Sequence, residues 1–217
     1  MRATIPNGEF RKADYSLFPT LVQVWNLNDH ADQKLAVDTI ESFAHEILMK
    51  WPADIGKGKT SSRYFDVISK THKTANFLDR AEFKTLKQDI QNCVDEYCVT
   101  CGLEQTIIDK SWFNIQEEDG HVNEHRHELS IVSGAYYPYC EEDSAPIVFT
   151  SPILGPKMTE IHNNATEFTS DKMEFHPRSG MLVLFPSWLY HRSLYNKTNK
   201  RITISFNTHH IEVDKET

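Results

Sequence analysis

Three histidines in the second half of the chain have the residue type and the spacing of a metal site. His125 and His127 are separated by one residue, and His191 follows the apolar run 181–190. Alternate residues of a strand point to the same face, so an extended segment would place His125 and His127 side by side. A third imidazole from a distant strand would complete the site, and imidazole is a ligand of iron, zinc, nickel and copper. The sequence therefore predicts a site of three neutral imidazoles.

An arginine begins a second informative segment, the strand-like run 201–207. Its alternate residues Arg201, Thr203, Ser205 and Asn207 would share one face. Polar side chains that face the interior unpaired cost a few kcal/mol each, so an inward orientation implies a polar ligand. A guanidinium pairs well with a carboxylate, and we expect Arg201 to anchor one beside the metal. An exposed strand with the same alternation is the alternative.

Two neighbouring segments contribute further candidates. Tyr136 and Tyr137 follow Ser133-Gly134, and one of the two tyrosines must face inward. Its hydroxyl could reach the same carboxylate. Trp112, Asn114 and Gln116 alternate on the preceding run, and we expect Asn114 to face the pocket. The remaining imidazoles are predicted not to be ligands: His121, His162, His176, His209 and His210.

The elements that position these residues follow from the periodicity of apolar side chains. We predict a strand at 17–27, a helix at 31–50 capped by Asn28 or Asp29, a loop or lid at 53–75, and a helix at 80–100 ended by Gly102. Short β-rich runs then follow one another: 106–116, 121–127, 129–139, 146–150, 166–175, 180–186, 189–194 and 201–208. Closely spaced strands without helices between them indicate an antiparallel sandwich or barrel.

The predicted fold is therefore mainly β with a helical buttress (α+β). It is a double-stranded β-helix, also called a jelly roll and cupin-like, of about eight antiparallel strands. We expect residues 1–217 to form a single domain, in which 1–105 provide a strand and two supporting helices and 106–210 the β core.

Composition excludes several classes of protein. A net charge of −8 argues against nucleic-acid binding. No apolar run approaches the ~18 residues of a membrane span, and the N-terminus lacks an apolar signal core, so we expect a cytoplasmic protein without a membrane partner. Cys93, Cys98, Cys101 and Cys140 are expected to be free thiols, because the Cys98–Cys101 CxxC has no second pair at zinc spacing. No pattern specifies an oligomeric state.

Four motifs together resemble a known family. They are His-x-His at 125–127, Ser-Gly-Ala-Tyr-Tyr at 133–137, Pro-x-x-Gly-Met-Leu-Val-Leu-Phe-Pro-Ser-Trp-Leu-x-His at 177–191, and Arg-Ile-Thr-Ile-Ser-Phe-Asn at 201–207. Over roughly 112–207 the chain resembles the 2-oxoglutarate/Fe(II)-dependent oxygenases of marine bacteria and their phages, which are similar to the prolyl-4-hydroxylase group.

The resemblance implies a role for each candidate residue. His125 and His191 would bind Fe(II), and His127 occupies the place of the carboxylate ligand of the wider superfamily. His127 would either coordinate as a third imidazole or stand aside while water or chloride fills the position. Arg201 would pair with the distal carboxylate of 2-oxoglutarate, and Tyr137 would hydrogen-bond it. Ser205 and Asn114 are the other expected contacts of the co-substrate.

The implied activity is a dioxygenase reaction, with hydroxylation as its default outcome. Oxidative decarboxylation of 2-oxoglutarate by O2 would be coupled to C–H oxidation of a small-molecule or peptidyl substrate, in the host cytoplasm if the chain is phage-encoded. Two alternatives remain open from the sequence. One is a cupin-like three-histidine dioxygenase or isomerase that does not use 2-oxoglutarate, and the other is a non-enzymatic β-sandwich interaction module.

Overall fold

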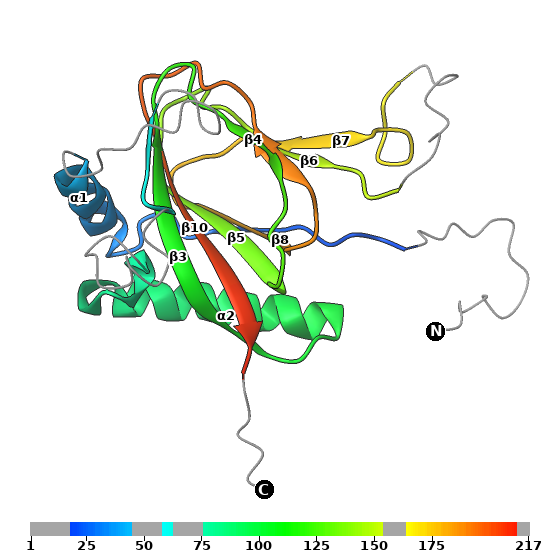
Figure 1. Ribbon diagram of the computed structural model, residues 1–217, viewed down its shortest axis with the longest axis horizontal. Coiled ribbons are helices and arrows are strands. Elements are labelled where there is room, and N and C mark those ends of the chain that lie inside the picture. Colours follow the sequence, from blue (N-terminus) through cyan, green and yellow to red (C-terminus); the bar gives the residue numbers. More distant parts are fainter. Residues whose placement is uncertain (1–17, 45–57, 63–75, 154–163, 212–217) are drawn as a thin grey trace, which may run out of the picture.

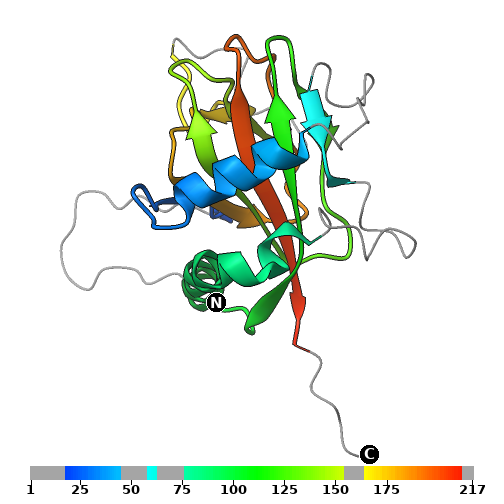
Figure 2. The ribbon, with the colours of Figure 1, turned by 90° about the vertical axis from the view of Figure 1, so that its left-hand side faces the viewer.

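Two antiparallel sheets face each other, and two helices cover the outer face of the larger sheet (Figures 1 and 2). The computed structural model describes residues 18–44, 58–62, 76–153 and 164–211. The residues predicted as a loop at 53–57 and 63–75 lie outside the described residues, as do the end of the predicted first helix and His162.

The larger sheet has six strands. In spatial order they are β1 (Gln23–Asn26), β8 (Met181–Pro186), β5 (Val132–Cys140), β10 (Arg201–His210), β3 (Thr106–Gln116) and β2 (Gly58–Thr60). The smaller sheet has four strands: β4 (Val122–His125), β9 (His191–Ser193), β6 (Ile147–Thr150) and β7 (Lys172–Phe175). The strands β3 to β10 correspond to the predicted β core, and the double-stranded β-helix is confirmed.

The two helices cover the larger sheet by means of their apolar stripes. Figure 2 shows α1 (Gln33–Phe43) crossing the strands, while α2 (Lys84–Cys101) lies near their lower end after two short 3-10 turns, Phe77–Asp79 and Ala81–Phe83. The buried stripes are Ala36, Ile40 and Phe43 on α1, and Leu86, Ile90, Cys93, Val94, Tyr97 and Cys98 on α2. Neither α1 nor α2 combines the length and the hydropathy that crossing a bilayer requires, and the described residues contain no other α-helix.

Gly102 ends the second helix as predicted. Its φ of 68° lies in the left-handed region, which glycine adopts without strain. The N–H of Leu103 donates to the carbonyl of Cys98, so the last turn keeps its hydrogen bonds.

The larger sheet separates an apolar face from a polar one. On β10, Ile202, Ile204 and Phe206 pack on the helices, whereas the alternate residues face the smaller sheet. The two-residue period of a strand thus produces both the core and the wall of a pocket.

The register of β5 decides which of the two adjacent tyrosines faces the pocket, and a bulge follows Tyr136. Tyr139 pairs with Ile202 and Tyr136 with Ile204, so Tyr137 and Pro138 together oppose the single residue Thr203. Tyr136 is buried in the core beneath the helices, and Tyr137 lines the pocket.

Several elements differ in extent from the predicted ones, and three of the differences have an identifiable cause. The strand expected at 121–127 ends at His125. The N–H of His127 donates to the carbonyl of Ser187 and not to β9, the strand that pairs with β4. The run predicted at 166–175 is extended only over Lys172–Phe175, since residues 166–170 close a turn on their own hydroxyls and carbonyls. Within the predicted loop, Gly58–Thr60 forms β2 by pairing with β3. The segment has no alternation of apolar and polar residues that would predict a strand.

The predicted helix cap is also wrong. Asp29 has a φ of 63° and belongs to a turn, and the N-cap of α1 is Asp32. The Asp32 carboxylate accepts the N–H of Leu86 instead of capping its own helix, so it ties α1 to α2.

Candidate metal centre

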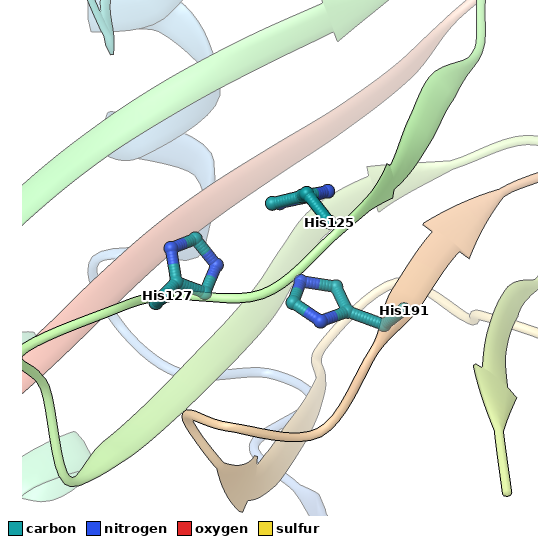
Figure 3. Close-up of side chains that lie close together, drawn as sticks. All are labelled: His125, His127 and His191. Carbon is teal, nitrogen blue, oxygen red and sulfur yellow. The ribbon is translucent and has the colours of Figure 1, made fainter. Parts of the chain in front are cut away.

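His125, His127 and His191 meet at one point between the two sheets. One ring nitrogen from each lies within 4.8 Å of the others, so the three side chains could hold a metal ion. The ring centroids are 5.0 Å apart for His125 and His127, 4.3 Å for His125 and His191, and 5.1 Å for His127 and His191. Figure 3 shows the three rings gathered at this point.

Strand pairing and a turn bring these rings together. His125, the last residue of β4, pairs directly with His191, the first residue of β9. His127 comes from the turn that follows β4, and its ring lies 5.6 Å from that of Trp112. The reasoning that two histidines on one strand share a face therefore does not apply to His127, which reaches the site from outside the strand.

Hydrogen bonds to carbonyl oxygens orient two of the imidazoles. Nδ1 of His125 lies 2.8 Å from the carbonyl of Asn123, and Nδ1 of His191 lies 2.9 Å from that of Leu189. A carbonyl oxygen only accepts, so Nδ1 carries the proton in each neutral ring. Nε2 of both rings is left with its lone pair, which is the form that binds a metal.

Burial keeps the imidazoles of His127 and His191 neutral. Burial, together with the neighbouring His125, lowers the pKa of His127 to about 4 and that of His191 to about 3. Near neutral pH both rings are therefore neutral and available as ligands.

The three histidines line a pocket of about 410 Å³. Its walls come from both sheets and from the segment after β2. The lining residues are Thr60, Ser62, Trp112, Asn114, Gln116, Val122, Asn123, Glu124, His125, His127, Gly134, Ala135, Tyr137, Ile147, Phe185, His191, Arg192, Ser193, Arg201, Thr203 and Ser205.

Arg201 supplies a buried positive charge to this pocket. It is 3% exposed and lies over the Tyr137 ring, with 5.7 Å between Cζ and the ring centroid. One terminal nitrogen donates to the carbonyl of Ala145 and the other to Oε1 of Gln116. Burial lowers the pKa of Arg201, but an arginine remains protonated in proteins. Among the described residues, no carboxylate pairs with it.

Two buried polar atoms of β10 that line the pocket have no hydrogen-bond partner among the described residues. They are Nε of Arg201 and Oγ1 of Thr203. Leaving such atoms unsatisfied costs about 1–3 kcal/mol each, so they fit a ligand that accepts hydrogen bonds. The donor set of three imidazoles likewise fits a divalent transition metal, and the pocket suits a metal with an anionic chelator.

All of the residues that were predicted to bind metal or co-substrate line this one pocket. Asn114 is on β3, Tyr137 on β5, and Arg201 and Ser205 are on β10. Their roles stay predictions. Thr203 and Gln116 lie among them and were not predicted as binding residues, although the alternation of their strands placed both on the inward face.

Other residues with metal-binding chemistry lie elsewhere in the described chain. His121, His176, His209 and His210 do not join the cluster. Cys98 is buried, with its thiol 3.7 Å from the Thr106 hydroxyl, whereas Cys101 is exposed. Both cysteines of the CxxC sequence are free thiols, and neither belongs to a metal-binding group among the described residues.

The sequence of the β core matches a known family. Residues 110–207 match the family described as "putative 2OG-Fe(II) oxygenase". The matched region covers a little under half of the chain, and the match indicates a 2-oxoglutarate-dependent oxygenase, an oxidoreductase whose cofactors are iron and 2-oxoglutarate. No curated protein sequence matches the chain significantly.

Solved structures of other 2-oxoglutarate oxygenases share the fold of this oxygenase. A Pseudomonas putida prolyl-4-hydroxylase is 13% identical, with a TM-score of 0.55 over 88% of this chain and 94% of that one. A prolyl hydroxylase from Trichoplax adhaerens, in complex with a hypoxia inducible factor peptide fragment, is 12% identical, with a TM-score of 0.53 over 86% and 82% of the two chains. The epimerase SnoN in complex with Fe3+, alpha ketoglutarate and nogalamycin RO is 11% identical, with a TM-score of 0.59 over 88% and 79%.

Proposed function

We propose that this oxygenase binds Fe(II) through His125, His127 and His191 and oxidises a C–H bond of its substrate, with hydroxylation as the outcome. One observation carries the proposal: a single pocket contains three clustered imidazoles together with a buried arginine that has no carboxylate partner among the described residues. A metal with a carboxylate-bearing chelator satisfies both groups at once.

The charge of the donor set supports a dianionic co-substrate. Three neutral imidazoles leave the charge of a divalent metal uncompensated, and 2-oxoglutarate carries two negative charges. When bound, iron and 2-oxoglutarate supply the oxidising chemistry, in which 2-oxoglutarate, O2 and a C–H bond give succinate, CO2 and a C–OH group.

The residues at the closed end of the pocket would orient the co-substrate. Arg201 would offer Nε and Thr203 its hydroxyl to the distal carboxylate, and both atoms are buried without a partner among the described residues. Tyr137 packs beneath the guanidinium and limits its movement. Asn114 and Ser205 line the same wall and would contact the chelator. The apolar side chains of Ile147 and Phe185 would keep water away from the reacting atoms.

The proposed substrate is a small molecule or a residue of a peptide, and it would enter beside Trp112. Asn123 and Glu124 are exposed on the pocket wall, and Ser62 is half-exposed there, as is this indole. The related structures include hydroxylases and an epimerase, so the substrate and outcome depend on this part of the pocket rather than on the fold.

The decisive experiment is the formation of succinate from 2-oxoglutarate by the purified chain with Fe(II), ascorbate and O2. We expect slow turnover without a substrate and faster turnover with one, found by screening free proline, peptides and small metabolites. His191→Ala should be inactive, and His176→Ala, at an exposed histidine outside the cluster, should behave as wild type. Metal binding without any succinate would instead favour a three-histidine metalloenzyme that does not use 2-oxoglutarate.

A further inference from the structure

Gln116 occupies a central place beside the arginine of the pocket. It is the last residue of β3, it pairs with Arg201 of β10, and it is 1% exposed. Its backbone carbonyl also accepts a hydrogen bond from Nδ2 of Asn196. The backbone from which the Gln116 side chain extends is therefore held in place on the wall of the pocket.

A chain of hydrogen bonds connects Gln116 to both sheets. Its Oε1 accepts from Arg201, and its Nε2 donates to Oγ of Ser193 over 3.0 Å. The same Ser193 hydroxyl accepts the N–H of Val122 over 2.8 Å. Ser193 belongs to the strand that begins with His191, and Val122 to the strand that ends with His125. Gln116 thus links the guanidinium to the strands that carry two of the clustered histidines.

The partners determine which way the amide points. A guanidinium has only donors, so the amide oxygen must face Arg201 and the NH2 group must face Ser193. A glutamate would have the same length and could accept from Arg201 equally well, but it would add a negative charge.

The neutrality of Gln116 matters because both acceptors of the arginine are neutral. The guanidinium donates to an amide oxygen and to the backbone carbonyl of Ala145. These contacts hold its position and leave its charge uncompensated, at a site where a buried charge without a partner is costly. A counter-charge must then come from a ligand.

We infer that Gln116 is a positioning residue that fixes the Arg201 guanidinium. Because Gln116 is neutral, the positive charge of Arg201 stays available to the distal carboxylate of the co-substrate. The inference rests on the proposed function, because it assumes that 2-oxoglutarate is the anion that Arg201 meets.

The test compares the affinity of two 2-oxo acids for the Fe(II)-loaded protein, measured by anaerobic calorimetry. 2-Oxoglutarate has a distal carboxylate, and 2-oxobutyrate has the same chelating end without one. Gln116→Glu should weaken 2-oxoglutarate binding by about tenfold or more, because an internal carboxylate then competes for Arg201. The affinity for 2-oxobutyrate and for Fe(II) should change by less than about threefold, which is under ~0.7 kcal/mol.

Two further variants complete the design. Gln116→Met keeps the length of the side chain without its hydrogen bonds, so it should weaken 2-oxoglutarate binding less than Gln116→Glu does. It also carries the test if Gln116→Glu does not fold: it should then weaken 2-oxoglutarate more than 2-oxobutyrate. Gln88→Glu makes the same charge change on the exposed face of α2 and should leave both affinities unchanged.

The possible failures are distinguishable. Gln116→Glu with wild-type affinity for 2-oxoglutarate, or with equal losses for both 2-oxo acids, would overturn the role of Gln116 and leave the proposed function intact. A wild-type protein that binds Fe(II) but not 2-oxoglutarate would overturn the proposed function itself, and the role of Gln116 with it.

Discussion

At the scale of single residues, the pocket combines two kinds of side chain that respond differently to burial. Burial keeps the imidazoles of His127 and His191 neutral, which is the form that can bind a metal at neutral pH. Burial does not neutralise the guanidinium of Arg201, because the ordinary pKa of an arginine lies far above neutrality. The same low-dielectric environment therefore produces neutral donors at one place and a fixed positive charge at another.

The first prediction concerns the third imidazole. If His127 coordinates the metal, His127→Asp should retain about one Fe(II) per chain, because a carboxylate is also a metal ligand. His191→Ala should lose the metal on desalting, and His176→Ala should keep it. Metal analysis after anaerobic reconstitution measures all three. Stoichiometric iron in both His125→Ala and His191→Ala would refute the assignment of the site.

The second prediction concerns the charge of Arg201. Arg201→Ala should weaken 2-oxoglutarate binding by roughly tenfold to a hundredfold while iron binding is retained, since a charged hydrogen bond contributes a few kcal/mol. Arg201→Lys should restore only part of the affinity, because an ammonium lacks the planar arrangement of donors. Anaerobic calorimetry measures the effect, with Arg178→Ala at an exposed arginine as the control. Unchanged affinity in Arg201→Ala would show that the arginine contacts a different anion.

At the scale of elements, the strands of the larger sheet contact different surroundings on their two faces. Their apolar face packs on α1 and α2, and their polar face forms the pocket. Small residues are required where two elements approach closely. An added Cβ at Gly134 would lie 2.2 Å from the ring of Phe206, which is fully buried on the neighbouring strand.

Gly134→Ala should therefore destabilise the fold. We expect a loss of about 1–3 kcal/mol in the free energy of unfolding, because the Phe206 ring has no free space into which it can move. Urea denaturation measures the loss. Phe206→Leu provides the control: the double variant should lose less than the sum of the two single variants. Additive losses would show that the two positions do not clash.

The cysteines of α2 and β5 allow a test of burial. The thiolate is the reactive form, and burial raises the pKa of Cys93 to about 11 and that of Cys140 to about 12. Cys101 is exposed at the end of α2. Iodoacetamide at pH 8 should therefore modify Cys101 before Cys93 and Cys140, as read by mass spectrometry. The rapid modification should disappear in Cys101→Ser, and equal rates at all of these cysteines would contradict the described packing.

At the scale of the whole molecule, the site bridges the two sheets. His125 and His191 belong to the smaller sheet, whereas Arg201, Tyr137 and Asn114 belong to the larger one. A metal and co-substrate bound between them would link strands of the two sheets. Ligand binding should therefore stabilise the fold as a whole.

This stabilisation is measurable as a shift in Tm. A ligand at 100 times its Kd stabilises the native state by about 2.7 kcal/mol, so Co(II) with 2-oxoglutarate should raise Tm by several degrees, and EDTA should reverse the shift. The two ligands together should stabilise more than Co(II) alone. His191→Ala should show no such shift. An equal shift in that variant would place the stabilising metal elsewhere.

The sequence alone determined the features that depend on local periodicity. The apolar stripes of α1 and α2, the Gly102 helix end, and the inward polar face of β10 follow from side-chain directions that repeat every 3.6 or 2 residues. The residue types also indicated an imidazole cluster and an anion site, because only a few side chains can bind metals or carboxylates. A match of several motifs then indicated the family, and the sequence match confirmed it.

The tertiary structure decided whatever depends on contacts between distant segments. The pairing of β5 with β8 and β10 placed Tyr137 rather than Tyr136 in the pocket, pairing with β3 made a strand of Gly58–Thr60, and a hydrogen bond to Ser187 turned His127 out of β4. Gln116 received its partners Arg201 and Ser193 in the same way. Strand register is fixed by partners far away in the chain, so local periodicity specifies which face a residue takes and not which residue it meets.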